Sequence, residues 1–407
     1  MTSVVLYFQV HQPWRLRRYT FFDIGRDSAY FDDALNVAIL RRVADRCYLP
    51  VNRLLLREIE RSEGAFRCAF SVSGTALEQM ETWTPEVVES FRALAATGCV
   101  EFLAETSHHS LAFLGDRDEF RAQVAAQRTT VERLIGTVPK GFRNTELVLH
   151  DDVARAVEEL GFDVLLGEGA DHVLGFRDPH RVYRPSGCER LKLLLRSYRF
   201  SDDIAFRFSD RGWSEWPLSP EKFAGWLAEL PAAADCVGLF MDYETAGEHQ
   251  WADSGILDFL AALPRALRAH RRFRFATPSE AAAQAAAREV VAVPGVTSWA
   301  DAERDLSAWL GNEMQRAAHA ALYELLPAVR ACGDPRVLDD WRRLSTSDHV
   351  YYMSTKYASD GDVHAYFSHW DTPHDAFIAF MNVLEDLERR TRRPRTARRA
   401  RTAGSRA

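Results

Sequence analysis

The feature that most constrains the fold is a regular alternation of two kinds of segment along the first 290 residues. Amphipathic segments such as 119–136 and 254–270 repeat apolar residues every three or four positions, as helices do. Between such segments, short apolar runs occur at 3–10, 65–72, 100–105, 140–146, 162–168, 236–244 and 272–277. This alternation predicts an α/β fold in which helices cover a parallel sheet, and a barrel is its expected closure at this length.

Two segments depart from the alternation. Residues 192–208 are compatible with extra strands or with an excursion inside one connection, and the sequence leaves both open. Pro294 and Gly295 mark a boundary, beyond which the pattern is mostly helical. We therefore expect a catalytic barrel at 1–290, a helical domain at 291–388 and a disordered arginine-rich tail at 389–407.

Composition and charge exclude several classes of protein. The six cysteines are isolated and form no CxxC pair, which argues against a disulfide framework and a zinc ribbon. The first residues carry neither a basic leader nor a long apolar run, so a cytoplasmic location is expected. The tail holds nine arginines and no acid; without them the net charge of −7 becomes −16. A body with this negative charge should repel a nucleic acid, which is therefore not an expected partner. A membrane is not an expected partner either, and the oligomeric state is left open.

Polar and ionisable residues follow several of the apolar runs, where a parallel barrel carries its reactive groups. They are His11 and Gln12 after the first run, Glu101 to His109 in and after the third, Glu146 at the end of the fourth, and Asp242, Glu244, Glu248 and His249 from residue 242 onwards. A single histidine or glutamate in such a place is more often structural than catalytic. Asp242 follows a strongly apolar stretch, where burial would shift its pKa, although capping a helix is an alternative role.

Two of these runs end in carboxylates, and this pairing suits the cleavage of glycosidic bonds. One carboxylate can attack the anomeric carbon while the other protonates the leaving oxygen. Tryptophans in polar surroundings could stack on the apolar faces of sugars, although some of them must serve packing; they are Trp14, Trp213, Trp216, Trp251, Trp299 and Trp309.

Several stretches together resemble the α-amylase-like enzymes of glycoside hydrolase family 57. They are HQP at 11–13, GCVE at 98–101, FRNTEL at 142–147, MDYETAGEH at 241–249, ATPSE at 276–280, SWADAERDLSAWLGN at 298–312 and STSDHVYYMSTK at 345–356. The resemblance covers nearly all of residues 4–388. It implies an incomplete (β/α)7 TIM-like barrel followed by a helical domain, and retaining chemistry on α-glucans without a metal or another cofactor.

By position in these motifs, Glu146 resembles the nucleophile of the family and Asp242 its general acid/base. The resemblance further implies substrate-binding or neighbouring roles for His11, Gln12, Glu101, His108, Arg143, His249, Trp213, Trp251, Trp299 and Trp309. Many members carry an arginine after the nucleophile, whereas Leu147 stands there in this chain, so the exact specificity stays open.

Four functions remain in competition. Hydrolysis of internal α-1,4-glucan bonds, an α-amylase-type activity, is favoured, and a 4-α-glucanotransferase or branching enzyme would use the same residues. A metal-dependent carbohydrate deacetylase or mannosidase could take ligands from His11, His108, His109 and Asp242. Two observations argue against a catalytic metal: the HQP stretch lacks the His-x-Asp pattern of such a site, and no HxxxH pair follows it. The fourth alternative is a glycan-binding protein without catalytic activity.

Overall fold

The computed structural model describes residues 1–392, apart from the side chains of 358–361. The chain forms two compact units, each built from separate segments. The first contains Met1–Gln12, Val37–Ser107 and Phe120–Asp305; the second contains Pro13–Asn36, His108–Glu119 and the chain from Leu306 onwards. Residues 291–305 thus belong to the first unit. The division into domains at residues 290 and 388 stays a prediction.

Seven neighbouring strands form the centre of the first unit. They are β1 (Thr2–Val10), β2 (Cys68–Val72), β3 (Val100–Leu103), β4 (Gly141–Arg143), β5 (Val164–Glu168), β7 (Lys192–Arg196) and β8 (Cys236–Asp242). Together with β9 (Phe273–Phe275), they confirm a strand in each of the seven predicted apolar runs. The ambiguous segment 192–208 contains one strand, β7, followed by helix α9 (Tyr198–Ala205).

The parallel sheet curls into an incomplete barrel, as predicted. Strands β7, β8, β1, β2 and β3 are neighbours in that order, and β4 pairs with β5, which pairs with β7. Two joints are narrow: β3 and β4 meet through the bridge Ala104↔Phe142, and β7 and β8 through the pair Arg196↔Gly238. Outside this arrangement, β6 (Tyr183–Pro185) pairs antiparallel with β7, and β10 (Glu289–Val291) pairs with β6.

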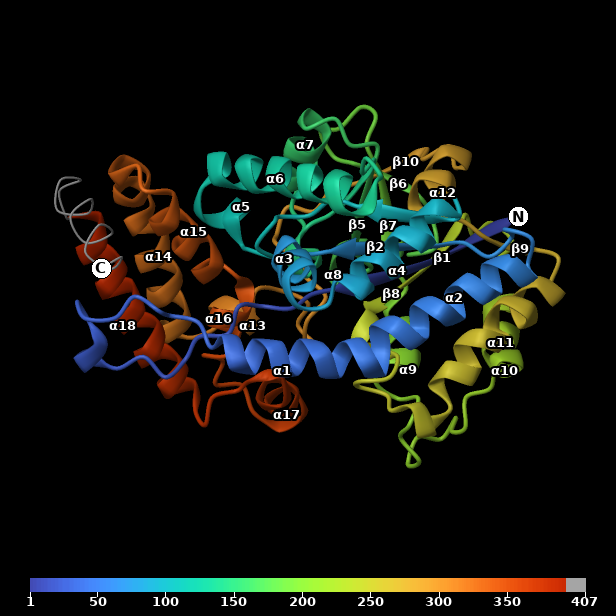
Figure 1. The fold of residues 1–407 in the computed structure, drawn as a ribbon. Coiled ribbons are helices and arrows are strands. Elements are labelled where there is room, and N and C mark those ends of the chain that lie inside the picture. The colour runs from blue at the N-terminus through green and yellow to red at the C-terminus, as the bar shows by residue number, and fades with distance from the viewer. Residues whose placement is uncertain (393–407) are drawn as a thin grey trace. The chain divides into compact units, whose positions relative to one another are not determined.

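Helices surround the strands of the first unit (Figure 1). They include α2 (Leu49–Arg61), α3 (Gly74–Trp83), α4 (Pro85–Ala96), α6 (Arg117–Ile135), α7 (Asp151–Glu159), α10 (Pro220–Ala228), α11 (Ile256–Ala269) and α12 (Pro278–Gln284). Helices α6 and α11 confirm the two amphipathic segments predicted at 119–136 and 254–270. Side-chain caps start some of these helices; the Ser73 hydroxyl, for example, accepts a hydrogen bond from the Ala76 N–H of α3.

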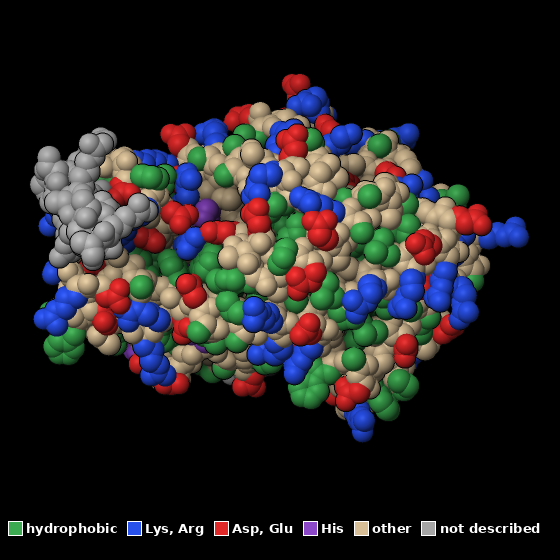
Figure 2. Space-filling model, in the orientation of Figure 1, with side chains coloured by type: hydrophobic (Ala, Val, Ile, Leu, Met, Phe, Trp, Pro, Cys, Tyr) green, Lys and Arg blue, Asp and Glu red, His purple; other side chains and the backbone are tan. Residues whose placement is uncertain are grey.

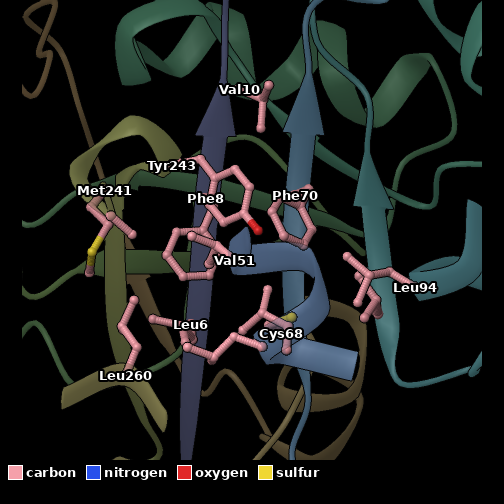
Figure 3. Close-up of a cluster of buried hydrophobic side chains, with 14 of the residues drawn as sticks. Leu6, Phe8, Val10, Val51, Cys68, Phe70, Leu94, Met241, Tyr243 and Leu260 are labelled. Carbon is pink, nitrogen blue, oxygen red and sulfur yellow. The ribbon is translucent and has the colours of Figure 1, made fainter. Parts of the chain in front are cut away.

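Strand β1 is buried along its whole length, because it packs on both faces. Successive side chains of a strand point to opposite faces. Leu6 and Phe8 therefore face the helices, where they meet Phe70 of β2 and residues of α2 and α11 (Figure 3). Val5 and Tyr7 point the other way, into a second cluster inside the curled sheet.

The second unit is helical, which confirms the predicted helical C-terminal region. Its helices include α13 (Ser307–Leu310), α14 (Glu313–Cys332), α15 (Pro335–Leu344), α16 (Ser347–Tyr351), α17 (Ala358–Phe367) and α18 (Pro373–Thr391). The early segment 13–36 belongs to this unit because α18 binds it. The buried Asp386 carboxylate of α18 accepts hydrogen bonds from the Gly25 N–H (2.6 Å) and the Tyr30 hydroxyl (2.5 Å).

The predicted arginine-rich tail begins inside a helix. Arg389 and Arg390 belong to α18, and the Arg390 guanidinium binds the Asp340 carboxylate (2.6 Å) and the Tyr30 hydroxyl (2.9 Å). The first residues of the tail therefore have an ordered structure, contrary to the prediction. Residues 393–407, on which the rest of that prediction falls, lie outside the described residues.

Acidic and basic side chains are mixed over the face of the molecule in view (Figure 2). Within residues 1–392, no helix is long and apolar enough to cross a membrane. The cytoplasmic location stays a prediction.

Candidate active site

The interior of the curled sheet changes from apolar to polar along its strands. Apolar side chains such as Val5, Leu103, Leu166, Leu194 and Phe240 fill its lower part. The last inward positions, read from strand register and alternation, hold Gln9, Ser71, Glu105, Arg143, Glu168, Arg196 and Asp242. Six of the seven strands thus carry a polar or charged interior residue at their carboxyl ends, and Glu105 follows two residues after β3. Barrel enzymes carry their active sites at this end of the strands.

Glu146 lies directly after β4, in a single helical turn (Thr145–Leu147). Its φ of 57° and the φ of 51° at Leu147 fall in the left-handed region, which residues other than glycine rarely adopt. The indole Nε1–H of Trp299 donates a hydrogen bond to Glu146 Oε2 at 2.8 Å. A strained backbone and a directed hydrogen bond together fix the orientation of this partly exposed carboxylate.

Two arginines flank the indole ring that binds Glu146. The Arg143 guanidinium lies 4.7 Å from the centre of the Trp299 ring, and the Arg196 guanidinium lies 5.7 Å from it. Arg143 is fully buried, and its three guanidinium nitrogens have no hydrogen-bond partner among the described residues. A buried charged group without hydrogen bonds is costly, so Arg143 is suited to bind a polar ligand.

Asp242 is the last residue of β8 and is partly exposed. It precedes a short helical turn, and its side chain makes no capping hydrogen bond to that turn, so the capping alternative is not supported. Gln9 of β1 lies level with it in the neighbouring strand. Burial raises the pKa of the Tyr7 hydroxyl; the charges of Glu105 and Asp242 add to the rise, and Arg143 opposes it. Tyr7 therefore lies within electrostatic range of charges from β3, β4 and β8.

A hydrogen-bonded network supports this end of the barrel from below. The Tyr7 hydroxyl donates to Gln9 Oε1 at 2.8 Å, and Gln9 Nε2 donates to Glu105 Oε1 at 2.9 Å. The Ser71 hydroxyl bonds to Tyr7 and donates to Gln9 Oε1 at 3.2 Å. Because each member of this buried network is bound to the next, the side chains beside Asp242 have little freedom to move.

Glu244, two residues beyond Asp242, is a second buried carboxyl group. The Tyr48 hydroxyl and the His11 backbone N–H donate hydrogen bonds to it, and Gln12 Nε2 donates to the Tyr48 hydroxyl at 3.2 Å. Burial raises the pKa of Glu244 to about 8, and the charge of Asp242 contributes to the rise. At neutral pH Glu244 is therefore mostly protonated.

A cluster of two acids and two arginines, of which Glu168 and Arg196 are buried, anchors the segment that carries Trp299. Arg196 binds Glu168 (3.3 Å) and Asp202 (2.5 Å), and Arg304 binds the same two carboxylates (3.4 and 3.5 Å). Arg304 also donates to the Trp299 carbonyl oxygen at 3.2 Å. Burial raises the pKa of Glu168 to about 7, against the effect of the two arginines.

The remaining predicted residues fall into different places in the first unit. His11 follows β1, and its Nδ1 hydrogen bonds to the Ser73 hydroxyl at 2.8 Å. Glu101 lies near the start of β3, and its carboxylate accepts from the Ser279 hydroxyl (2.5 Å) and N–H (2.9 Å). His249 has its pKa lowered to about 4 by burial, so it is neutral. Trp251 is exposed, and Trp213 lines a separate pocket. Their roles in substrate binding stay predictions.

His108 and Trp309 belong to the second unit. Burial and the nearby charges of Arg342 and Arg343 lower the pKa of His108 to about 3. Trp309 is only 2% exposed and packs against Tyr351 at 5.9 Å, as a core residue does. Within the described part of the chain, no group of three or more histidine, cysteine, aspartate or glutamate residues is arranged to hold a metal ion.

Sequence reasoning missed four polar residues at the strand ends, namely Gln9, Ser71, Glu168 and Arg196, whereas Glu105 lies in the stretch Glu101 to His109 that it named. The signal that could have found them is the two-residue period of a strand: the residue two positions before each of these five is an apolar or aromatic member of the interior cluster, namely Tyr7, Ala69, Leu103, Leu166 and Leu194. A polar residue that continues this series marks the functional end of the barrel.

Comparisons with known proteins place this arrangement in a family. The sequence model of Glycosyl hydrolase family 57 matches residues 5–294. A protein of Methanocaldococcus jannaschii named "Putative alpha-amylase" is 38% identical over 398 residues, which cover 94% of this chain and 83% of that protein.

Solved structures of other proteins share the fold. A GH57-type branching enzyme from Pyrococcus horikoshii matches with a TM-score of 0.67 at 15% identity, over 95% of this chain and 88% of that chain. A 4-alpha-glucanotransferase from Thermococcus litoralis matches with a TM-score of 0.66 at 15% identity. The match covers 86% of this chain and 56% of the glucanotransferase chain. Because the family match spans the barrel and the archaeal relative aligns over almost the whole chain, this protein belongs to glycosyl hydrolase family 57.

Proposed function

We propose that this enzyme is a retaining glycoside hydrolase of α-amylase type, which cleaves α-1,4-glucans by double displacement. Glu146 is the nucleophile and Asp242 is the general acid/base. The observation that carries the proposal is the setting of Glu146: a carboxylate at the end of β4, in a strained backbone conformation, oriented by the Trp299 indole. Asp242 ends β8 of the same barrel. The 38% identical relative named "Putative alpha-amylase" supports the choice of substrate.

In the first step, the Glu146 carboxylate attacks the anomeric carbon, while Asp242 gives its proton to the departing glycosidic oxygen. The bond to the leaving sugar breaks as the bond to Glu146 forms. In the second step, Asp242, now ionised, takes a proton from water, and the resulting hydroxide attacks the anomeric carbon and releases Glu146. Two inversions at one carbon retain its configuration.

The surroundings of Glu146 suit a nucleophile, which must be ionised at the working pH. The Trp299 N–H donates to the ionised form, and a hydrogen bond to the charged form of a carboxyl group lowers its pKa. The buried guanidinium of Arg143, 4.7 Å from the centre of the same indole, supplies positive charge together with donors for substrate hydroxyl groups.

The surroundings of Asp242 suit a proton donor. A second carboxyl group, Glu244, lies two residues away, and two neighbouring carboxyl groups resist losing both protons. The pair therefore retains a proton to higher pH than a single exposed carboxyl group does. The two carboxyl groups share this proton, which Glu244 holds at neutral pH and Asp242 must hold when the first step begins.

Transfer to a sugar hydroxyl instead of water would make the enzyme a 4-α-glucanotransferase or a branching enzyme, with the same first step. Incubation with amylose distinguishes these outcomes. We expect reducing ends to increase in proportion to the bonds cleaved. Redistribution of chain lengths at a constant number of reducing ends would indicate a transferase, and new α-1,6 branch points would indicate a branching enzyme.

The nucleophile is tested by Glu146→Ala, which should remove nearly all cleavage. Azide should restore part of it and yield a glycosyl azide of inverted configuration, because the small anion fills the vacated space and attacks once. Glu159→Ala is the matched control, since Glu159 is an exposed glutamate of α7. Substantial activity of Glu146→Ala without azide would contradict the proposal.

A further inference from the structure

The first unit contains a pocket that none of the proposed catalytic residues lines. Its volume is about 900 Å³, within the range of known ligand pockets. The segment that follows β5, helix α9, the loop around residue 213 and the end of α10 form its walls. Of the predicted sugar-binding residues, it contains Trp213 but neither Glu146 nor Asp242.

Four aromatic side chains line the pocket: Tyr198, Phe200, Trp213 and Trp226. Phe200 and both tryptophans also pack against the main hydrophobic core, so their positions are fixed from behind. The two indoles stand edge to face, with their centres 6.1 Å apart and their planes at 71°. The Trp213 and Trp226 rings therefore present two apolar surfaces that are inclined to each other, which suits a bent ligand with apolar faces.

Charged groups of both signs lie beside these rings. Asp171 accepts a hydrogen bond from the Tyr198 hydroxyl at 2.7 Å, and Asp203 pairs with Arg207 at 2.5 Å. Arg199 and Glu229 are exposed members of the lining. Carboxylates accept hydrogen bonds and guanidinium groups donate several in one plane, so together they can bind neighbouring hydroxyl groups of a sugar.

We propose that this pocket binds a segment of an α-glucan chain as a second site, apart from the residues that perform the reaction. Pyranose rings combine an apolar face with a rim of hydroxyl groups, which matches aromatic planes set beside mixed charges. A purely cationic ligand fits less well, because two of the four carboxylates of the lining are already paired: Asp203 with Arg207, and Glu215 with Lys222 at the rim. Lys222 also lies 5.4 Å from the Trp226 ring. The choice of ligand rests on the proposed function.

The experiment measures maltoheptaose binding by calorimetry in the Glu146→Gln full-length protein, which cannot consume the ligand. Trp226→Ala, and separately the double substitution Arg199→Ala with Glu229→Ala, are added to this background. Phe206→Ala is the matched control, because Phe206 is an exposed aromatic residue just after α9 that does not line the pocket. Tyr198 is avoided, since Arg304 stacks on its ring at 4.1 Å.

We expect each pocket variant to lose one class of binding site or to weaken it at least about tenfold, a difference of about 1.4 kcal/mol. The control should match the parent. Isotherms identical to the parent in both pocket variants overturn the inference, as does preferential binding of tetramethylammonium. If Trp226→Ala fails to fold, the double variant of two exposed residues decides alone.

Activity on amylose is measured separately, in the protein with Glu146 intact. A protein that cleaves amylose but shows unchanged isotherms in both pocket variants refutes the second site only. A protein that cleaves no glucan but loses maltoheptaose binding in these variants refutes the proposed activity and supports the site.

Discussion

At the scale of single residues, the Trp299 indole has the most direct connection to the chemistry. Its Nε1–H is bound to Glu146, and two guanidinium groups lie near the centre of its ring, Arg143 at 4.7 Å and Arg196 at 5.7 Å. Trp299 therefore has two possible roles: it positions the Glu146 carboxylate, or it stacks on a sugar ring as the sequence predicts. A phenylalanine at position 299 distinguishes the two roles, because stacking on a sugar needs only the aromatic ring, whereas positioning Glu146 needs the N–H.

Trp299→Phe keeps an aromatic face and removes the N–H. A hydrogen bond to a charged group contributes roughly 1.5–3 kcal/mol, so kcat should fall about 10- to 100-fold. Because the carboxylate loses a donor, the acidic limb of the pH profile of kcat/KM should move to higher pH. Trp83→Phe is the control. An unchanged kcat and pH profile, with a change in KM only, would favour stacking on sugar.

Glu244 should make the stability of the protein depend on pH. Its folded pKa of about 8 exceeds its ordinary value, so the folded protein holds this proton while the unfolded chain releases it. Stability should therefore fall as the pH rises from about 4.5 to 8, by at most roughly 5 kcal/mol. Glu244→Gln removes this contribution. Urea unfolding at pH 5 and pH 9 should show a smaller loss in the variant, and equal losses in both proteins would contradict the assignment.

At the scale of elements, the segment that carries Trp299 depends on the cluster of Glu168, Asp202, Arg196 and Arg304. Three separate elements, β5, β7 and α9, bring these charges together. Breaking a buried ion pair by removing one partner costs about 3–5 kcal/mol, because the remaining charges stay buried. The cluster should therefore link the stability of the barrel to the orientation of Glu146.

Arg304→Met tests this link. We expect a loss of about 3 kcal/mol in the free energy of unfolding, together with a lower kcat, because the Trp299 carbonyl also loses its donor. Arg304→Lys should recover part of both. Thermal unfolding and steady-state kinetics on amylose measure the two effects. A variant with lower stability and a normal kcat would separate the cluster from catalysis.

The strands were predictable from sequence because each is a short apolar run between helical patterns, and Glu146 and Asp242 were found at the ends of two of them. The position of Glu101 was not predictable, since the run 100–105 does not show that β3 ends at Leu103. Trp309 illustrates the same limit, because a polar neighbourhood in sequence can surround a side chain that is buried in the fold. The contact of Trp299 with Glu146 joins residues 153 positions apart, which no local pattern reveals.

At the scale of the whole molecule, the C-terminal end of α18 contributes to the second unit through Arg390. Truncation after Arg392 keeps Arg390 and its bonds, and this protein is the reference for the melting temperature. Truncation after Glu388 also removes Arg390 and its bonds to Asp340 and Tyr30, and should cost about 1–3 kcal/mol. Equal melting temperatures for the two truncated proteins would show that Arg390 contributes nothing.

The central claim is that Glu146 forms a covalent bond to the sugar, which requires the two carboxyl groups to lie about 5–5.5 Å apart when substrate is bound. The most direct measurement is to trap this intermediate with 5-fluoro-α-glucosyl fluoride, an activated substrate whose fluorine slows the second step. Peptide mass spectrometry then locates the label. The account predicts a single adduct on Glu146, absent from Glu146→Gln. An adduct on Asp242, Glu244 or Glu105, or cleavage of amylose with inverted configuration, would contradict it.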